Sequence, residues 1–220
     1  MKAHEACTDA REGFLYDDWR RWVAIFILAS ASPRRQELLR MMGCNFQVHA
    51  SAVAELAGGD APEGIAVGNA GSKAMSVAAR HPGIPVLGAD TVVALGNQIY
   101  GKPKDPEEAE AMLRSLSGRT HQVITGIAFA LDKRMMVDSE MTEVRFGAMT
   151  DKEIRDYIAT GEPMDKAGAY ALQGRAEAFI ESIHGSWSNV VGLPLCKVRT
   201  LARKAGIDLY GDHGTGFARR

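Results

Sequence analysis

The sequence predicts an α/β domain built around a mixed β-sheet. Helical patterns alternate first with single strands and then with hairpins along the 220 residues, an order typical of α/β proteins. The composition is 46% hydrophobic and 24% charged, which excludes a wholly disordered or fibrous chain. No repeat or change in composition divides residues 23–207, so we expect a single domain there.

The two ends of the chain are expected to lie outside this domain. Residues 1–22 mix both charges without a period and predict an extension, and residues 208–220 predict a mobile tail. The apolar run 22–29 follows Arg20 and Arg21 and imitates a targeting signal, but the region before it is acidic. No apolar run approaches the ~20 residues that cross a bilayer. We therefore expect a cytoplasmic protein that does not enter a membrane.

The first elements are a buried strand and a helix. Residues 23–28 form a short, continuous apolar run, which is typical of a central strand buried on both faces. Ser32 is the expected N-cap of a helix that begins at Pro33 and ends at Gly43. A second helix is expected from Asp60, with Glu63 completing a variant capping box, to about Arg80.

The same start and stop signals predict the remaining elements. In order, these are a strand over 86–95, a turn at Gly96-Asn97 into 98–100, a helix from Asp105 to Ser117, strands 121–131 and 135–146 joined by Asp132-Lys133, a helix from Thr150 to Gly161, a glycine-rich stretch to Gly174, strands near 178–183 and 187–192, and a last helix to Gly206.

Charge and cysteine content narrow the classes of partner. The chain carries 26 Lys and Arg against 27 Asp and Glu, whereas a protein that binds a nucleic acid polymer normally has a basic excess. A small anionic ligand needs only a local cluster of cations. Cys7, Cys44 and Cys196 are widely spaced and predict reduced thiols rather than a zinc or redox site.

The segment Ser30 to Arg35 is a candidate anion site. Free N–H groups and the helix dipole attract anions to a helix N-terminus, and Arg34 and Arg35 add fork-shaped donors in the first turn. Arginine otherwise has the wrong sign there, which suggests a compensating anion. Two solvated surface arginines remain the alternative.

Asp90 is the sharpest single candidate, because it interrupts the apolar strand 86–95. An unpaired buried carboxylate costs several kcal/mol, so Asp90 must be hydrogen-bonded, bound to a metal or open to a cleft. A structural salt bridge is the alternative to a functional site.

Further cations lie in two loops. Residues 96–102 fit G-x-x-x-x-G-K, but Pro103 replaces the Ser or Thr of a P-loop and a hairpin interrupts the segment, so we reject that motif. Lys102 remains a candidate phosphate ligand. A later glycine- and alanine-rich loop carries Lys166 and Gln173; it suits close approach of a ligand, or simply a turn.

Taken in order, these segments resemble the Maf family of nucleoside triphosphate pyrophosphatases over about 25–206. The motifs that carry the resemblance are Ser-x-Ser-Pro-Arg-Arg at 30–35, Ser72-Lys73-Ala74, Gly88-Ala89-Asp90-Thr91, Gly101-Lys102-Pro103, Leu116-Ser117-Gly118 with His121, Asp165-Lys166-Ala167-Gly168-Ala169-Tyr170, and Val191-Gly192-Leu193-Pro194.

The resemblance implies an elongated, ITPase-like fold with two lobes flanking a nucleotide-binding cleft. It also implies hydrolysis of a nucleoside triphosphate to the monophosphate and pyrophosphate with Mg²⁺ or Mn²⁺, a house-cleaning activity linked to arrest of cell division. Asp90 would be the proton acceptor, a metal ligand with Glu55, or both. The substrate-binding residues would be Ser30, Arg34, Arg35, Glu55, Lys73, Lys102 and Lys166.

Two features depart from the family pattern: Ala54-Glu55 stands where relatives often have paired acidic residues, and the N-terminal extension is long. Arg34, Thr91 and Gln173 resemble the branch that acts on dTTP and UTP, modified pyrimidine nucleotides included. The branch acting on 7-methyl-GTP, and a non-catalytic nucleotide sensor that regulates septum formation, are the alternatives. A homodimer is left open.

Overall fold

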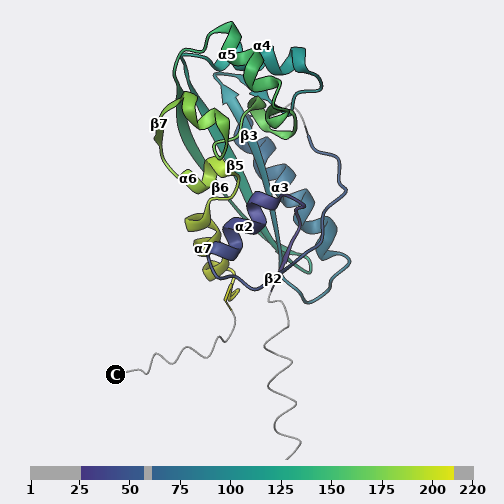
Figure 1. The fold of residues 1–220 in the computed structure, drawn as a ribbon. Coiled ribbons are helices and arrows are strands. Elements are labelled where there is room, and N and C mark those ends of the chain that lie inside the picture. Colours follow the sequence, from purple (N-terminus) through teal and green to yellow (C-terminus); the bar gives the residue numbers. More distant parts are fainter. Residues whose placement is uncertain (1–25, 57–60, 211–220) are drawn as a thin grey trace, which may run out of the picture.

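The computed structural model describes residues 26–56 and 61–210 (Figure 1). One mixed sheet runs through them in the order β2-β1-β3-β5-β6-β7, with β4 beside β3. β1 is parallel to β2 and β3, and the other pairs are antiparallel. The strands are β1 (Phe26–Leu28), β2 (Phe46–Val48), β3 (Val86–Leu95), β4 (Gln98–Tyr100), β5 (Thr120–Leu131), β6 (Arg134–Phe146) and β7 (Ile180–His184).

Helices cover both faces of this sheet. α3 packs on β3 and β5 from one face, and α6 and α7 pack on β5 and β6 from the other. α4 and α5 lie at one end of the molecule and α2 and α7 at the other (Figure 1). The helices are α2 (Pro33–Met41), α3 (Pro62–Ala78), α4 (Pro106–Leu116), α5 (Asp151–Ile158), α6 (Trp187–Val191) and α7 (Leu195–Lys204), with short 3₁₀ turns at Glu162–Asp165, Ala167–Ala169 and Arg175–Phe179.

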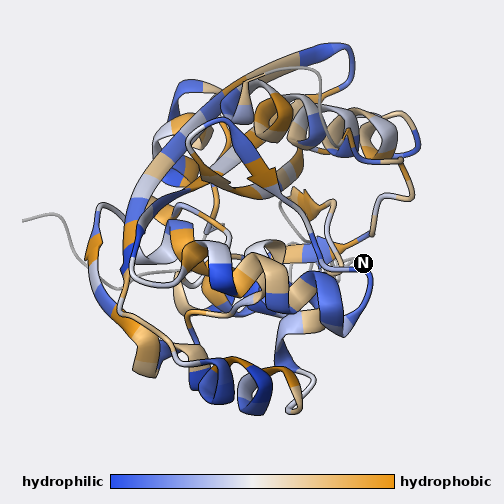
Figure 2. Cartoon of the chain, turned by 90° about the horizontal axis from the view of Figure 1, so that it is seen from above, coloured by the Kyte–Doolittle hydropathy of each residue, from blue (hydrophilic) through white to orange (hydrophobic). Residues whose placement is uncertain are grey.

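The apolar side chains form separate clusters at the two ends of the sheet. One joins β1, α2 and α7 around Phe26 and Leu38, and another joins α4 and α5 around Leu113 and Phe146. Hydrophobic and hydrophilic residues alternate along the elements, as expected where one side of each is buried (Figure 2). The long strands β3, β5 and β6 connect the clusters, which confirms an elongated α/β domain with two lobes.

Sequence patterns failed at three places. The strand expected at 187–192 is wrong: this segment is α6, begun by Ser186, whose side chain accepts from the backbone of Asn189. The three-residue strand β2 was missed, because so short a run has no measurable period. The N-cap of α3 is Ala61, which makes no side-chain capping hydrogen bond, and Asp60 of the expected capping box lies outside the described residues.

The limits of the domain are partly outside the described residues. The expected extension 1–22 and most of the expected tail are not described, and neither is the start of the first strand at 23–25. Leu209 is buried in the core and its carbonyl accepts from the backbone N–H of Asn45, so the packed chain continues past residue 207. Among the described residues, no helix combines the length and apolar character needed to cross a membrane.

Helix α3 lies directly on the sheet backbone at two glycines. A Cβ atom at Gly88 would lie 2.2 Å from the carbonyl oxygen of Ala70, and one at Gly126 would lie 2.4 Å from backbone atoms of Ala66. Neither position can hold a side chain unless helix and sheet separate. This close approach brings Lys73 of α3 over strand β3.

We expect Gly126→Ala to lower the free energy of unfolding by about 1–3 kcal/mol, because the added methyl group overpacks the α3–β5 contact. Gly68→Ala on the same helix is the matched control: its Cβ would lie 3.9 Å from Leu56 Cδ1, and helix propensity predicts a gain of up to about 1 kcal/mol. Urea unfolding measures both variants. Equal stabilities would contradict the close packing at Gly126.

Candidate active site

A cleft of about 850 Å³ opens where, among the described residues, no strand pairs with one edge of β3. β1 pairs with β3 only as far as Leu87, and β4 pairs with it only from Val93 onward. Asp90 and Thr91 lie in this gap and point to opposite faces of the sheet, yet both line the cleft. The structure brings all ten residues predicted from the sequence to this one cleft: Ser30, Arg34, Arg35, Glu55, Lys73, Asp90, Thr91, Lys102, Lys166 and Gln173.

Asp90 is 6% exposed, and both of its carboxylate oxygens accept hydrogen bonds. Lys73 Nζ donates to Oδ1 at 2.6 Å, and Asn69 Nδ2 donates to Oδ2 at 2.9 Å. Hydrogen bonds of this kind fix the orientation of the carboxylate group. Asp90 therefore has both the salt bridge and the opening to a cleft that the sequence left as alternatives.

Glu55 shares the ammonium group of Lys73. It lies between β2 and α3, and Lys73 Nζ donates to its Oε1 at 2.5 Å. Burial raises the pKa of Glu55, but the hydrogen bond and charge of Lys73, with the charges of Lys102 and Arg35, outweigh burial and lower this pKa below its usual value. Two carboxylates thus stand on either side of one buried cation.

Arg35 anchors the first turn of α2 to the rest of the cleft wall. Its Nε donates to the carbonyl of Gly192 at 2.9 Å, and its two terminal nitrogens donate to the hydroxyls of Ser30 and Thr91 at 3.0 and 3.1 Å. Burial lowers the pKa of Arg35, while the charge of Asp90 raises it. Arg35 is consequently both a structural link and a positive charge inside the cleft.

The N-terminal turn of α2 leaves its donors available. Ser32 occupies the expected N-cap position, but its side chain makes no capping hydrogen bond. The turn lines the cleft from Ser30 to Arg35. Free N–H groups at a helix start favour a bound anion.

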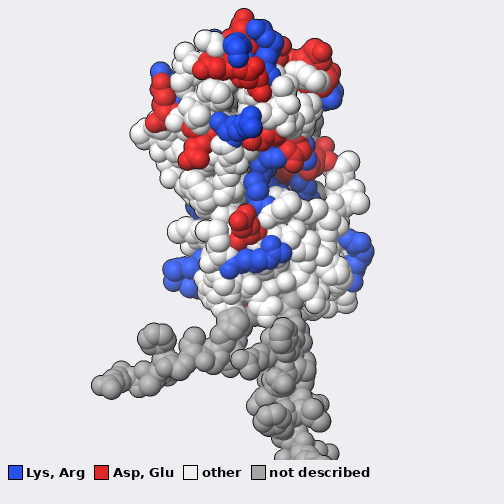
Figure 3. Space-filling view, in the orientation of Figure 1, with Lys and Arg blue, Asp and Glu red and all other residues white. Residues whose placement is uncertain are grey.

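The cleft has an excess of two positive charges, although the chain as a whole has a net charge of −1. Its cations are Arg34, Arg35, Lys73, Lys102 and Lys166, and its carboxylates are Glu55, Asp90 and Asp165. Figure 3 shows Lys and Arg gathered in the hollow between the two lobes. This local excess suits a polyanionic ligand.

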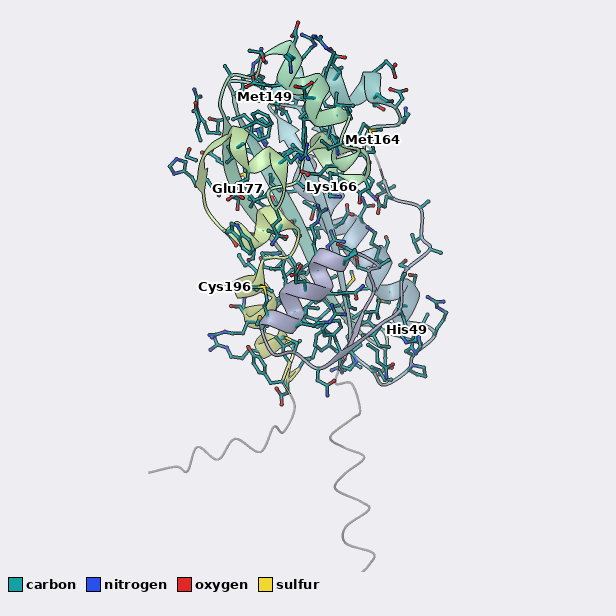
Figure 4. The ribbon with its side chains drawn as sticks, viewed as in Figure 1. His49, Met149, Met164, Lys166, Glu177 and Cys196 are labelled. Atoms are coloured by element: carbon teal, nitrogen blue, oxygen red, sulfur yellow. The ribbon has the colours of Figure 1, made fainter. Side chains whose placement is uncertain are left out.

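The outer cations differ in how they are held. Lys102 has no ion pair among the described residues, whereas Lys166 pairs with Asp165. Figure 4 shows Lys166 at mid-height, between Met164 in one lobe and His49 in the other. Burial lowers the pKa of Arg34, against opposing contributions from Asp165 and other neighbours. A bound anion would offset this cost of burying Arg34.

Two of the predicted specificity residues, Thr91 and Gln173, differ in whether their polar groups already form hydrogen bonds. The Thr91 hydroxyl is occupied by Arg35 and by Thr125, with the two hydroxyl oxygens 2.9 Å apart. Gln173 is exposed at the cleft, and its amide has no hydrogen-bond partner within the described part of the chain. Gln173 is therefore free to read a ligand, while Thr91 supports Arg35.

Asn69 is a site residue that sequence reasoning missed. Besides its bond to Asp90, its side chain accepts from the N–H of Leu56 at 2.8 Å and donates to the carbonyl of Leu56 at 3.1 Å. It thereby fastens the segment that carries Glu55 beside Asp90. The available signal was its position four residues before Lys73, which places both on one helix face.

Another missed residue is Asn189, which lies fully buried behind the cleft. Its Nδ2 donates to the carbonyl of Val123 and to the hydroxyl of Thr142, both at 2.9 Å, while its backbone carbonyl accepts from the hydroxyl of Thr125 at 3.3 Å. It therefore holds α6 against the strands. His121 also lies outside the cleft lining: it bonds the Tyr170 hydroxyl at 2.8 Å, and burial lowers its pKa to about 4.

The carboxylate oxygens of the cleft suit a hard divalent cation that is also held by the phosphates of a bound ligand. Asp90 and Glu55 supply carboxylate oxygens, the ligand type that Mg²⁺ and Mn²⁺ prefer. No cluster of three or more His, Cys, Asp or Glu exists among the described residues, so an ion here would need further oxygens from phosphates or water. That pattern is usual for Mg²⁺ at phosphate sites.

Comparison with known proteins identifies the family of the chain. The family model described as "Maf-like protein" matches residues 25–205. The chain belongs to the Maf family. The resemblance drawn from the sequence motifs is confirmed, and the matched region spans the whole sheet and every predicted residue of the cleft.

Several curated Maf relatives are similar over nearly their full length. The chain is 49% identical to the dTTP/UTP pyrophosphatase of Symbiobacterium thermophilum, over 84% of this chain and 95% of that protein. It is 50% identical to the one of Geotalea uraniireducens, over 82% and 94%. Among solved structures, the Ham1 protein of Staphylococcus aureus matches at 14% identity with a TM-score of 0.40, covering 70% of this chain and 90% of that one, which is too distant to support a conclusion.

In this Maf-like cleft, Arg35 and Lys102 are expected to differ in their effect on stability. Arg35→Ala should lower the free energy of unfolding by about 2–3 kcal/mol, because three acceptors lose a charged donor. Lys102→Ala should change it by less than about 0.5 kcal/mol, as is usual for an exposed side chain without a partner. Chemical denaturation monitored by circular dichroism distinguishes them, and equal losses would refute the anchoring role of Arg35.

Proposed function

We propose that this chain is a cytoplasmic nucleoside triphosphate pyrophosphatase that hydrolyses dTTP and UTP to the monophosphate and pyrophosphate. The observation that carries the proposal is Asp90, a buried and doubly hydrogen-bonded carboxylate in a cleft with surplus cations. The names of the curated relatives support the same reaction and the same bases. A cleft with two excess positive charges fits one small polyanion. We therefore propose a small nucleotide, and not a nucleic acid polymer, as the ligand.

The reaction needs a base beside the α-phosphorus. The oxygen of a water molecule forms a bond to this phosphorus. At the same time, the bond between the α-phosphorus and the oxygen that links it to the β-phosphate breaks. Asp90 takes the proton of the water, and the electron pair of the broken bond leaves with pyrophosphate. Lys73 and Asn69 orient the carboxylate for this task, one at each oxygen.

The cations stabilise the leaving group. Arg34 and the N–H groups at the start of α2 would contact the phosphates together with Lys102 and Lys166, which line the same cleft. Positive groups held in place where charge develops lower the barrier without reorganising. Ser30 keeps Arg35 aligned through its hydroxyl.

We propose that Asp90 and Glu55 hold a Mg²⁺ or Mn²⁺ ion together with the substrate phosphates. When bound, this ion supplies positive charge that offsets the phosphate oxygens. Lys73 lies between the two carboxylates, so its ammonium group would share them with the ion. Activity should be lost in a chelator and restored by added Mn²⁺.

Gln173 gives the site its preference for uracil and thymine. These bases present a carbonyl beside an N–H group, and an amide can pair with both at once. A carboxylate lacks the donor for the carbonyl, although it can accept from the N1–H and amino group of a guanine. The free amide of Gln173 at the cleft is consistent with this role.

The proposal is tested by incubating the purified protein with a panel of nucleoside triphosphates and Mn²⁺. Pyrophosphate and orthophosphate are assayed separately, and the nucleotide product is identified. The proposal predicts pyrophosphate and the monophosphate from dTTP and UTP. Orthophosphate alone would refute it, and tight binding without any turnover would favour the nucleotide sensor.

Asp90→Asn should lower kcat by at least ~10²-fold, because the amide keeps the size of the side chain but cannot accept the proton. Nucleotide binding should change less. Asp156→Asn, at an exposed position on α5, is the matched control and should leave turnover unchanged. A correctly folded Asp90→Asn variant with more than a tenth of the original turnover would show that Asp90 has only a structural role.

For base preference, kcat/KM for dTTP and UTP should exceed that for 7-methyl-GTP by at least ~10-fold. Gln173→Glu should reduce this ratio, because the donor to the pyrimidine carbonyl is lost. Gln47→Glu on β2, which does not line the cleft, should leave the ratio unchanged. Competition assays with all three nucleotides measure it, and an unmodified protein that prefers 7-methyl-GTP would exclude Gln173 as the reader of the base.

A further inference from the structure

A tyrosine and a glutamate at the end of α5 hold both ends of the loop that carries Gln173. Tyr157 is 3% exposed, and its hydroxyl accepts from the backbone N–H of Ala171 at 3.2 Å. The same hydroxyl donates to Glu162 Oε1 at 2.9 Å. Glu162 Oε2 in turn accepts from the backbone N–H of Arg175 at 3.2 Å. Gln173 lies midway between the two backbone groups that are held.

The contact between these two side chains is built locally. Tyr157 lies in the last turn of α5, and the hydroxyl of Thr160 accepts from the N–H of Glu162 at 3.1 Å, which holds the turn after the helix. Gly174 leaves room for the carboxylate, since a Cβ atom there would lie 2.4 Å from Glu162 Oε1. Burial and the hydrogen bond to Glu162 raise the pKa of Tyr157, so the hydroxyl keeps the proton that it donates.

The loop presents Gln173 to the cleft while the residues beside it are fixed. Leu172 is 7% exposed and packs into the apolar cluster that joins β1, α2 and α7. The amide of Gln173 is exposed and has no hydrogen-bond partner in residues 26–56 and 61–210. A recognition group must be held within about 0.5 Å of its pairing geometry to discriminate between ligands. The position of Gln173 therefore depends on the backbone at Ala171 and Arg175.

We propose that Tyr157 and Glu162 are positioning residues for base recognition, and that they act by holding the backbone on both sides of Gln173. This inference rests on the proposed role of Gln173 as the reader of uracil and thymine. Neither Tyr157 nor Glu162 lines the cleft, so both act through the loop and not by touching the nucleotide. Glu162 also places negative charge near Arg34, so a test must separate base recognition from phosphate binding.

Calorimetry with two ligands makes this separation. The Asp90→Asn background, which should bind nucleotide without turnover, is titrated with dTTP and with inorganic tripolyphosphate, which has no base. Tyr157→Phe keeps the ring and removes the hydroxyl. It should weaken dTTP binding at least ~5-fold, the effect of about one hydrogen bond, and should change tripolyphosphate binding by less than ~2-fold.

Glu162→Gln provides a second variant at a less buried position. The amide has one oxygen for two donors, so dTTP binding should again weaken at least ~5-fold. Tripolyphosphate should bind at least as tightly as before, because a negative charge near Arg34 is lost. A loss confined to the ligand with a base is the result that a role in phosphate binding or in general stability would not give.

Gln173→Ala shows whether the effect passes through the amide. In its presence, Tyr157→Phe should weaken dTTP binding by less than ~2-fold further, because the two changes remove the same interaction. Ser115→Ala is the matched control. Its hydroxyl lies 2.6 Å from that of Tyr100, which shares an apolar cluster with Tyr157, and Ser115 does not line the cleft. This control should leave the binding of both ligands unchanged.

Circular dichroism confirms that each variant folds. The proposal is overturned if Tyr157→Phe and Glu162→Gln bind dTTP as tightly as their parent, if Tyr157→Phe weakens both ligands equally, or if its full effect persists beside Gln173→Ala. All of these outcomes are measured by binding. A chain that shows the expected pattern but does not turn over dTTP with Asp90 intact would therefore refute the proposed reaction and leave this inference standing.

Discussion

The contact between α3 and the sheet at Gly88 and Gly126 is the constraint on which the rest of the site depends. The absence of side chains at these positions lets the helix backbone rest on β3 and β5. At that distance, Asn69 and Lys73 reach the carboxylate of Asp90 with short hydrogen bonds. A wider separation would leave a buried carboxylate without partners, at a cost of several kcal/mol.

The cleft follows from the unequal lengths of neighbouring strands. β1 ends beside Leu87 and β4 begins beside Val93, so the strand between them borders open space. Because side chains alternate along β3, Asp90 joins the α3 side of the site and Thr91 joins the α2 side. A single open stretch of strand thus connects the proposed base with the arginines that would hold phosphates.

Two charged side chains of the cleft both hold its walls together and supply its charge. Lys73 neutralises two carboxylates while it positions them, and Arg35 links α2, β3 and the loop after α6 while it keeps a buried positive charge. Such groups are stable without a ligand because each has several partners. Lys102 and Gln173, which have none among the described residues, are left to meet the substrate.

The sequence by itself determined the long elements, the α/β class and ten residues of the cleft, because glycine and proline signals, apolar runs and ordered motifs are local properties. It did not determine α6, whose five residues are too few to show a helical period, or β2, which is also too short to show a period. Only the tertiary structure decided that Lys73 bridges Glu55 and Asp90 and that Asn69 fastens both. These are contacts between segments far apart in the chain, and they depend on the distance at which α3 meets the sheet and on where each strand ends.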